Sequence, residues 1–180
     1  MKRLIAASLL SVSALMAGAH NVGSNCSDQA HSGIFADISA GAETGDFGND
    51  FALALKVGYR LNLYEGLSWN IASMGAGMGV SYPDDINMRF MSGFRYNLPF
   101  CFNNRSVYVN ADFGYCFDTY DTAFGGFAYE VGAGVNFSRL ISLGIVWEGS
   151  VWNYHEETYL YELSAKCKFG TIGLKLGFNF

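Results

Sequence analysis

The residues best suited to chemistry in this sequence are Ser150 and His155, which lie close to two acids, Glu156 and Glu157. A serine hydroxyl activated by a histidine can attack an ester when a third group orients the imidazole. Polar and apolar residues alternate through this region, so we expect Ser150 on the inner side of a strand and His155 in the loop that follows it. Because the two side chains should then lie apart, we interpret His155 as a solvated loop residue and predict no catalytic site.

Two pairs of adjacent acids could instead bind a divalent cation. Asp84 precedes Asp85, and Glu156 precedes Glu157. These pairs could hold Ca²⁺ or Mg²⁺ between loops, or bridge through cations to phosphate groups at a membrane surface. Calcium sites take roughly six to eight oxygen ligands from a loop of defined spacing, and no segment of the sequence has that spacing. We therefore predict neither a metal site nor a cofactor, and interpret these acids as solvated charge.

The elements that would position these residues are strands. From Ser32 onward, apolar and polar residues alternate with a period of two between turn-like breaks, as in strands whose two faces meet different surroundings. Most segments are near the roughly 9–11 residues that a tilted transmembrane strand needs. Nine segments can be distinguished, at 33–43, 51–63, 67–82, 88–98, 106–118, 126–138, 141–153, 159–169 and 171–180.

One face of these segments is apolar and free of charge. In segment 51–63, for example, Leu53, Leu55 and Val57 alternate with Ala54 and Lys56. A charge that faces lipid near the bilayer midplane costs about 2–4 kcal/mol, so this exclusion is what a lipid-facing surface requires. The charges on the opposite, polar face are Asp37, Lys56, Arg60, Arg89, Arg95, Asp112, Glu130, Glu148, Glu162, Lys166, Lys168 and Lys175.

Alternation alone also fits a soluble barrel, whose apolar face lines the interior. Composition favours lipid outside, because only 15% of the residues are charged, against about 25% in soluble domains. Aromatic residues make up 16% of the chain, and the polar face is crowded with glycine and alanine, for example at Gly75, Gly77 and Gly79, as expected for a narrow, filled interior under an aromatic girdle. The composition therefore predicts a transmembrane β-barrel.

The N-terminal stretch has the layout of a cleaved secretory signal. Lys2 and Arg3 precede an apolar run at 4–16 and the small residues at 17–19, which predicts a signal peptide over 1–19. A periplasmic tail would then cover 20–32 and one barrel domain 33–180. The net charge of −5 argues against a nucleic-acid partner.

The connections between segments differ in charge. Those at 44–50, 83–87, 119–125 and 154–158 carry acids and are generally longer than the others. Outer-membrane barrels keep short turns in the periplasm and long loops outside, so we predict an acidic external rim. Its predicted residues are Asp46, Asp84, Asp85, Asp121, His155, Glu156 and Glu157.

The segments over 32–169 resemble the small outer-membrane barrels of the OmpA-like transmembrane and opacity-protein type. The resemblance includes the stretch 132–137, a short turn, and the stretch 142–145. The terminal Phe180, with Phe178 two residues before it, resembles the signal read by the barrel-assembly machinery. The resemblance implies an all-β, up-and-down antiparallel barrel with an even number of strands. Since nine segments cannot close such a barrel, we predict eight strands, with ten as the alternative.

Seven charged residues are expected to form a network inside the barrel. In a narrow lumen they should pair, because an unpaired buried charge is very costly. The alternative is a gated pore in which the same pairs exchange partners, although an eight-stranded lumen is normally filled by side chains. The seven residues are Lys56, Arg60, Arg89, Arg95, Asp112, Glu130 and Glu148.

Four cysteines in an exported chain allow disulfides. Cys101 falls in a periplasmic turn and Cys116 near the far end of the next strand, so most of a strand separates them. Cys26 in the tail could reach Cys101. Cys167 falls on the apolar phase with Phe169, where it would pack as a small hydrophobe.

These features predict an integral outer-membrane barrel with a structural or surface-recognition role exerted through acidic external loops. The expected partners are outer-membrane lipid, lipopolysaccharide and the barrel-assembly machinery. The alternatives are a rim enzyme acting on lipid A, a narrow ion or solute channel, and a soluble ligand-binding barrel.

Overall fold

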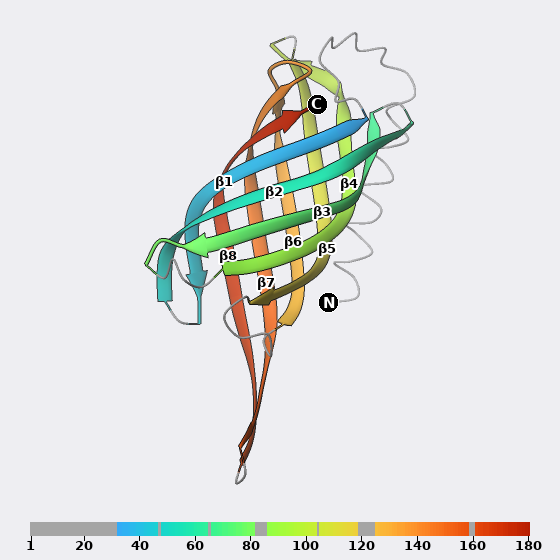
Figure 1. Ribbon diagram of the computed structural model, residues 1–180. Coiled ribbons are helices and arrows are strands. Elements are labelled where there is room, and N and C mark those ends of the chain that lie inside the picture. Colours follow the sequence, from blue (N-terminus) through green and yellow to red (C-terminus); the bar gives the residue numbers. More distant parts are fainter. Residues whose placement is uncertain are drawn as a thin grey trace, which may run out of the picture.

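A computed structural model describes residues 32–46, 48–64, 66–81, 86–103, 105–118, 125–158 and 161–180. The predicted signal at 1–19 and nearly all of the predicted tail lie outside the described residues. In these ranges the chain forms one closed antiparallel barrel (Figure 1). Its strands are β1 (Gly33–Gly45), β2 (Gly48–Tyr64), β3 (Leu67–Gly79), β4 (Ile86–Phe102), β5 (Arg105–Asp118), β6 (Gly125–Asn136), β7 (Ile141–Thr158) and β8 (Tyr161–Asn179).

Each strand pairs with its neighbours in sequence, and β1 closes the barrel by pairing with β8. The prediction of an eight-stranded up-and-down barrel is therefore confirmed. Ten strands, the alternative, is wrong. No helix long and apolar enough to cross a membrane is found in the part of the chain that the structure describes.

The ninth segment arose from a false turn at Gly170. Segments 159–169 and 171–180 are one strand, β8, which pairs with β7 without interruption through Phe169, Gly170 and Thr171. Phe169 packs inside the barrel against Trp152, whereas Lys168 is exposed. The assignment of Phe169 to the lipid phase and Lys168 to the polar phase is therefore wrong. The sequence-based prediction placed apolar residues on the lipid side both before and after Gly170. In the structure, alternate residues of β8 keep pointing inward and outward without a break at Gly170.

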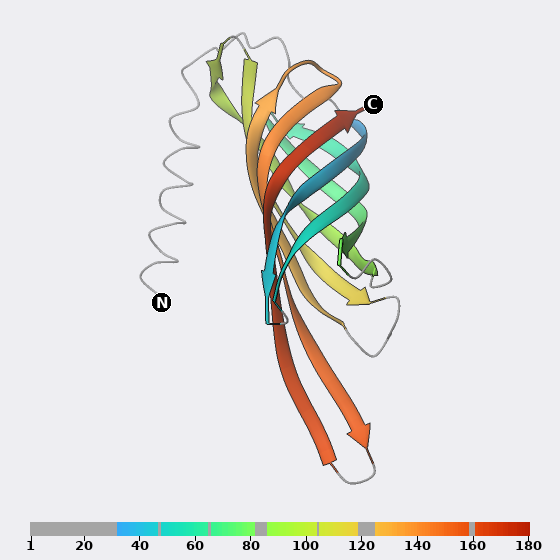
Figure 2. The same cartoon turned by 90° about the vertical axis from the view of Figure 1, so that its left-hand side faces the viewer.

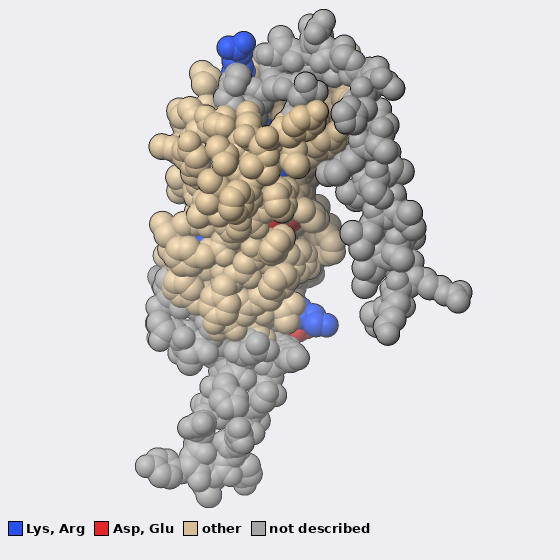
Figure 3. All heavy atoms as spheres, turned by 90° about the vertical axis from the view of Figure 1, so that its right-hand side faces the viewer, with Lys and Arg blue, Asp and Glu red and all other residues tan. Residues whose placement is uncertain are grey.

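The apolar face points outward and the polar face inward. Leu55 is 50% exposed, whereas the next residue, Lys56, is 6% exposed. The same contrast recurs around the barrel, where Phe113 is exposed and Asp112 is buried. Figure 3 shows one side of the molecule as almost uncharged between its two ends. A soluble barrel with an apolar interior, one of the alternatives considered, has the opposite arrangement and is excluded.

Three short connections lie at one end of the barrel, at 65–66, 103–104 and 137–140. Gly66 adopts a positive φ of 77°, and a Cβ there would lie 2.7 Å from the carbonyl oxygen of Asn97, so the turn requires glycine. This end is called the turn end below. The opposite end, the loop end, holds the connections at 46–47, 80–85, 119–124 and 159–160.

The loop end is less uniform than the sequence predicts. By the strand bounds, the connections at 80–85 and 119–124 span six residues each, but those at 46–47 and 159–160 span only two. The predicted loop at 154–158 is instead the continuation of β7. β7 leaves its β6 partner at Asn153, and β8 meets its β1 partner only from Phe169 onward. Between these points the two strands pair only with each other and project beyond the barrel as a hairpin (Figures 1 and 2).

Candidate functional site

The polar interior is the most structured candidate site of the described residues, and Lys56 lies at its centre. Its Nζ is 2.5 Å from Glu130 Oε2, 3.0 Å from Asp112 Oδ2 and 3.7 Å from Asp37 Oδ2. All four side chains are less than a tenth exposed. One cation from β2 therefore links carboxylates from β1, β5 and β6.

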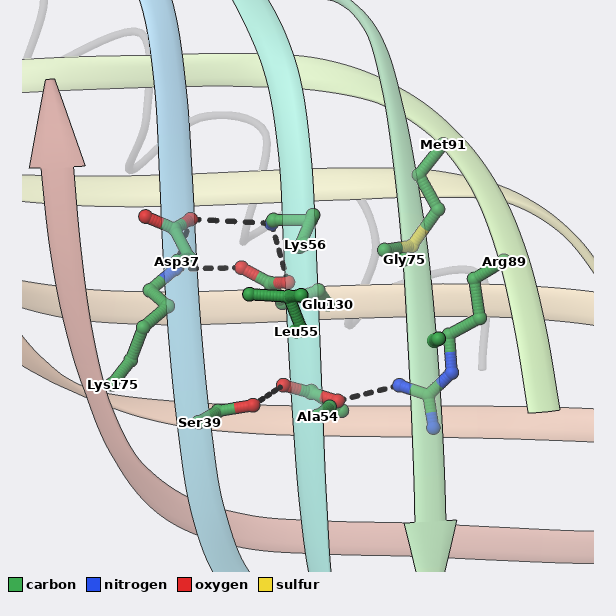
Figure 4. A pocket seen from close by; sticks show the side chains of 12 residues that line it. Asp37, Ser39, Ala54, Leu55, Lys56, Gly75, Arg89, Met91, Glu130 and Lys175 are labelled. Carbon is green, nitrogen blue, oxygen red and sulfur yellow. Dashed lines mark hydrogen bonds and ion pairs between the residues drawn. The ribbon is translucent and has the colours of Figure 1, made fainter. Parts of the chain in front are cut away.

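Lys175, from β8, provides a second cation to the same acids. Its Nζ lies 2.6 Å from Glu130 Oε1 and 4.0 Å from Asp37 Oδ2. It also donates to Asn110 Oδ1 at 3.1 Å, while Asn110 Nδ2 donates to Glu130 Oε1 at 2.8 Å. Figure 4 shows Asp37, Lys56, Glu130 and Lys175 converging within the barrel. Both oxygens of Glu130 thus accept hydrogen bonds from a lysine.

A separate ion pair lies nearer the loop end. Arg89 Nη1 is 2.5 Å from Glu148 Oε2, and Glu148 Oε1 accepts a hydrogen bond of 2.8 Å from the Ser39 hydroxyl. Arg89 comes from β4 and Glu148 from β7, so the pair crosses the lumen. Both residues are buried. Figure 4 shows Arg89 set apart from the lysine cluster.

Two further guanidinium groups, those of Arg60 and Arg95, lie toward the turn end. Arg60 donates to the side-chain oxygens of Asn70 and Asn179, at 2.9 and 2.5 Å. Arg95 donates to Asn136 Oδ1 and lies over the ring of Tyr108. No carboxylate of the described residues lies within ion-pairing distance of either guanidinium.

The space left between these side chains is small. A cavity lined by Asp37, Lys56, Arg89, Glu148 and Lys175 has a volume of about 10 Å³, room for about one water molecule. The described side chains thus fill the middle of the lumen, as expected for eight strands. The arrangement offers charged hydrogen-bonding groups around a cavity of this size.

The comparisons with known proteins are at the level of structure. No family model and no curated protein sequence matches the chain. The crystal structure of the outer membrane enzyme PagL matches with a TM-score of 0.54 and 13% identity, over 80% of this chain and 99% of that one. The crystal structure of Neisserial surface protein A matches with a TM-score of 0.51 and 12% identity, over 83% of this chain and 97% of that one.

This chain has the fold of the eight-stranded outer-membrane β-barrels. At identities this low the likeness concerns the fold alone, and the two matched proteins are one enzyme and one surface protein by their names. A shared barrel therefore does not select between catalysis and surface recognition. The role has to be argued from the barrel's own residues.

All seven residues of the predicted interior network are buried in this barrel. Lys56, Asp112 and Glu130 are brought together, and Arg89 meets Glu148. Arg60 and Arg95 join amides instead of acids. The sequence-based network omitted two charged members and several amides, although all lie on the inward phase of their strands. The omitted residues are Asp37, Lys175, Asn70, Asn110, Asn136 and Asn179.

Ser150 and His155 are not brought together. Ser150 is buried and accepts a hydrogen bond of 2.6 Å from Trp152 Nε1. His155 follows five residues later in the same extended strand, a separation of roughly 17 Å at about 3.3 Å per residue. The side chain of His155 lies outside the described residues. An ester-cleaving pair of these two residues is therefore not supported.

The predicted external rim is described only in part. Asp46 is exposed at the loop end, and its Oδ2 accepts a hydrogen bond of 2.9 Å from the backbone N–H of Lys168. Asp84, Asp85 and Asp121 lie outside the described residues. Glu156 and Glu157 belong to β7 like His155, with side chains that are likewise not described. No cluster of three metal-ligating side chains is found where side chains are described.

The predicted assembly signal, Phe178 and Phe180, lies at the end of β8. The backbone N–H of Phe180 donates to the carbonyl of Ile34 at 2.8 Å, and the ring of Phe180 is exposed at the turn end. Phe178 pairs with Ala36 of β1 and Ile141 of β7.

Cys101 is disulfide-bonded and Cys116 is free and buried. Cys26 and the side chain of Cys167 lie outside the described residues.

Proposed function

We propose that this chain is an integral protein of a bacterial outer membrane with a structural or surface-recognition role, and that it is neither an enzyme nor an open pore. The observation that carries the proposal is the contrast between two surfaces of the same strands. The outer surface is apolar around the barrel, while the inner surface is filled with paired charges. An apolar outer surface of this kind is stable in the hydrocarbon core of a membrane, so we infer that lipid surrounds the barrel.

The filled interior argues against an open channel. Lys56, Lys175 and Glu130 occupy the middle of the lumen from three different strands, and Arg89 with Glu148 crosses it nearer the loop end. A solute would have to separate buried ion pairs, and leaving one such charge unpaired costs about 3–5 kcal/mol. We therefore favour a barrel with a filled interior over a gated pore.

Any surface recognition would be carried out by the segments that extend beyond the barrel at the loop end. We place this end outside the cell because the long connections lie here and the short turns lie opposite. Among the described residues, the hairpin of β7 and β8 projects past the barrel, and its sequence includes Glu156, Glu157 and Glu162. The acidic rim would meet lipopolysaccharide or a surface partner, with cations between anionic groups.

The proposed location requires that the chain be exported and then assembled into the membrane. The chain would enter the periplasm through the signal at 1–19, which is then removed. The exposed Phe180 and the apolar residues at every second position before it would present the assembly signal. Both steps precede insertion into lipid.

The test is expression of the full chain in a Gram-negative host, followed by membrane fractionation and gel electrophoresis of heated and unheated detergent extracts. The expected result is an outer-membrane protein that lacks residues 1–19 and migrates differently before and after heating. Planar bilayers containing the folded protein should show no steady conductance. A soluble periplasmic product would overturn the membrane assignment, and stable ion-conducting steps would overturn the closed lumen in favour of a channel.

A further inference from the structure

Arg60 and Arg95 have strong partners, but no carboxylate of the described residues lies within ion-pairing distance of either. The Arg60 guanidinium lies 4.6 Å from the ring centroid of Phe35, and the Arg95 guanidinium lies 3.5 Å from that of Tyr108. Each arginine is only 2% exposed. Cation–π contacts and amide hydrogen bonds stabilise a guanidinium, but they do not neutralise it.

Among the described residues, the four buried acids of the middle and loop end contact other cations. Asp37, Asp112 and Glu130 surround Lys56, and Glu148 pairs with Arg89. Arg60 is linked to this cluster through one amide, because Asn70 accepts from Arg60 and donates to Asp112 at 2.9 Å. No described residue makes such a bridge for Arg95. Lys56 and Lys175 together meet three acids, so one negative charge of this cluster is left to offset Arg60. Arg95 is then left with one positive charge that no described acid offsets, and a buried charge without compensation costs several kcal/mol.

The same end also holds four buried polar atoms that lack a hydrogen-bond partner. They are Arg95 Nε, Tyr108 Oη, Ser142 Oγ and Asn179 Nδ2. The arginine and amide nitrogens can only donate, and the two hydroxyls are free to donate as well. An excess of unpaired donors beside excess positive charge calls for an acceptor that is negatively charged.

These four atoms belong to one neighbourhood. Tyr108 lies under the guanidinium of Arg95, and Asn179 accepts from Arg60. Ser142 is the register partner of Asn136, whose side chain accepts from Arg95. Tyr108 and Asn179 thus each contact one of the two turn-end arginines, and Ser142 lies beside the residue that accepts from Arg95.

We propose that the turn end of the lumen binds a small monovalent anion of the size of chloride between Arg60 and Arg95. The anion would accept hydrogen bonds from the unpaired donors and offset the one positive charge that the described acids leave uncompensated. The surrounding side chains are fully buried, with Tyr108 at 0% and Ser142 at 1% exposure, so a single-atom anion fits better than a phosphate. This inference is independent of the proposed surface role.

The first experiment is crystallography of the refolded full chain in sodium bromide, using the anomalous signal of bromide. The expected result is a bromide peak beside Arg95 Nε. A peak-free site containing only water would overturn the proposal, because water satisfies the donors without supplying charge. A bromide found only on the outer surface would likewise be an adventitious ion and would overturn it.

A second experiment measures thermal unfolding in detergent micelles, in sodium chloride and in sodium methanesulfonate at equal ionic strength. Binding to the folded state alone raises the midpoint with the logarithm of chloride concentration above the dissociation constant. The expected chloride-specific rise should be lost in Arg95→Gln and reduced in Ser142→Ala, which removes one donor without removing charge.

The matched control is Arg89→Gln, which removes a buried cation that has its own acid. This variant should be less stable but should keep the chloride-specific rise. If Arg95→Gln does not fold, Ser142→Ala and the bromide map decide the question. Equal midpoints in the two salts for the unmodified chain would contradict the proposal.

Discussion

Lys56 Nζ lies 2.5 Å from Glu130 Oε2, in a contact that spans the lumen from β2 to β6. The two strands are not neighbours in the sheet, so this pair ties opposite walls of the barrel together. Removal of Lys56 leaves Asp112 without its lysine, and leaves Asp37 and Glu130 to share Lys175 alone.

Lys56→Met should therefore destabilise the barrel strongly. Breaking a buried ion pair from one side costs about 3–5 kcal/mol, and the free energy of unfolding, measured by urea titration in lipid vesicles, should fall by about that amount. Lys168→Met is the control, because Lys168 is exposed at the loop end and its loss should change the free energy by about 0.5 kcal/mol or less. Equal effects of the two substitutions would show that the interior charges are not coupled as described.

The double variant Lys56→Met/Glu130→Gln tests the same contact from both sides. It removes one positive and one negative charge together, so it should be more stable than Lys56→Met alone. Strict additivity of the two single effects in the same urea titration would mean that the residues do not interact.

A charge placed on the outer surface should be costly at mid-strand and cheap at the end of the same strand. Leu55 is exposed in the middle of β2, and Tyr64 is its last residue. Leu55→Lys should lower the free energy of unfolding in vesicles by about 2–4 kcal/mol and Tyr64→Lys by about 0–1 kcal/mol. No difference between the two positions would argue against a lipid belt centred on the middle of β2.

Close approach inside the barrel can be tested at glycine. A Cβ at Gly134 would lie 2.4 Å from the carbonyl oxygen of Leu143 and 2.7 Å from Tyr108 Oη, whereas one at Gly170 meets no atom closer than 3.5 Å. Gly134→Ala should cost about 1–3 kcal/mol through overpacking, and Gly170→Ala should be tolerated. The heat-dependent gel shift gives the midpoint of each variant, and a tolerated Gly134→Ala would show that the interior is looser than described.

The disulfide of Cys101 is expected to join the N-terminal tail to the turn end. Cys116 is free, and Cys167 pairs with Trp152 on the loop-end side of β8, so Cys26 is the partner that we predict. Mass spectrometry of a non-reduced digest should find the Cys26–Cys101 peptide pair. A Cys101–Cys167 pair would instead contradict the positions of these residues at opposite ends of the barrel.

The fold could be predicted from the sequence because a strand exposes alternate residues to opposite sides, so one period reports both the strand and its surroundings. The error at Gly170 has the same origin. In β8 the apolar residues lie on the outward face after Gly170, as at Ile172, but Phe169 before it lies on the inward face. From the sequence alone, a glycine at such a change in pattern is interpreted as a turn. Only the unbroken pairing with β7 separates a long strand from two short ones.

The site was less predictable, because period two says which residues point inward but not which of them meet. Contacts across the lumen depend on the stagger of strands that are distant in sequence. The sequence therefore indicated that Lys56 and Glu130 are both inside, but not that Arg60 and Arg95 would meet asparagines instead of acids. Asp37 and Lys175 were missed for the same reason.

The most direct test of the account compares two native tryptophans in vesicles of brominated lipid. Trp147 is 49% exposed on the outer face of β7, and Trp152, in the same strand, is 7% exposed and hydrogen-bonded to Ser150 inside the barrel. Trp69→Phe/Trp152→Phe leaves only Trp147, and Trp69→Phe/Trp147→Phe leaves only Trp152. Bromolipid should quench the fluorescence of Trp147 strongly and that of Trp152 weakly. Strong quenching of Trp152 with an unquenched Trp147 would contradict a barrel with lipid outside and polar residues within.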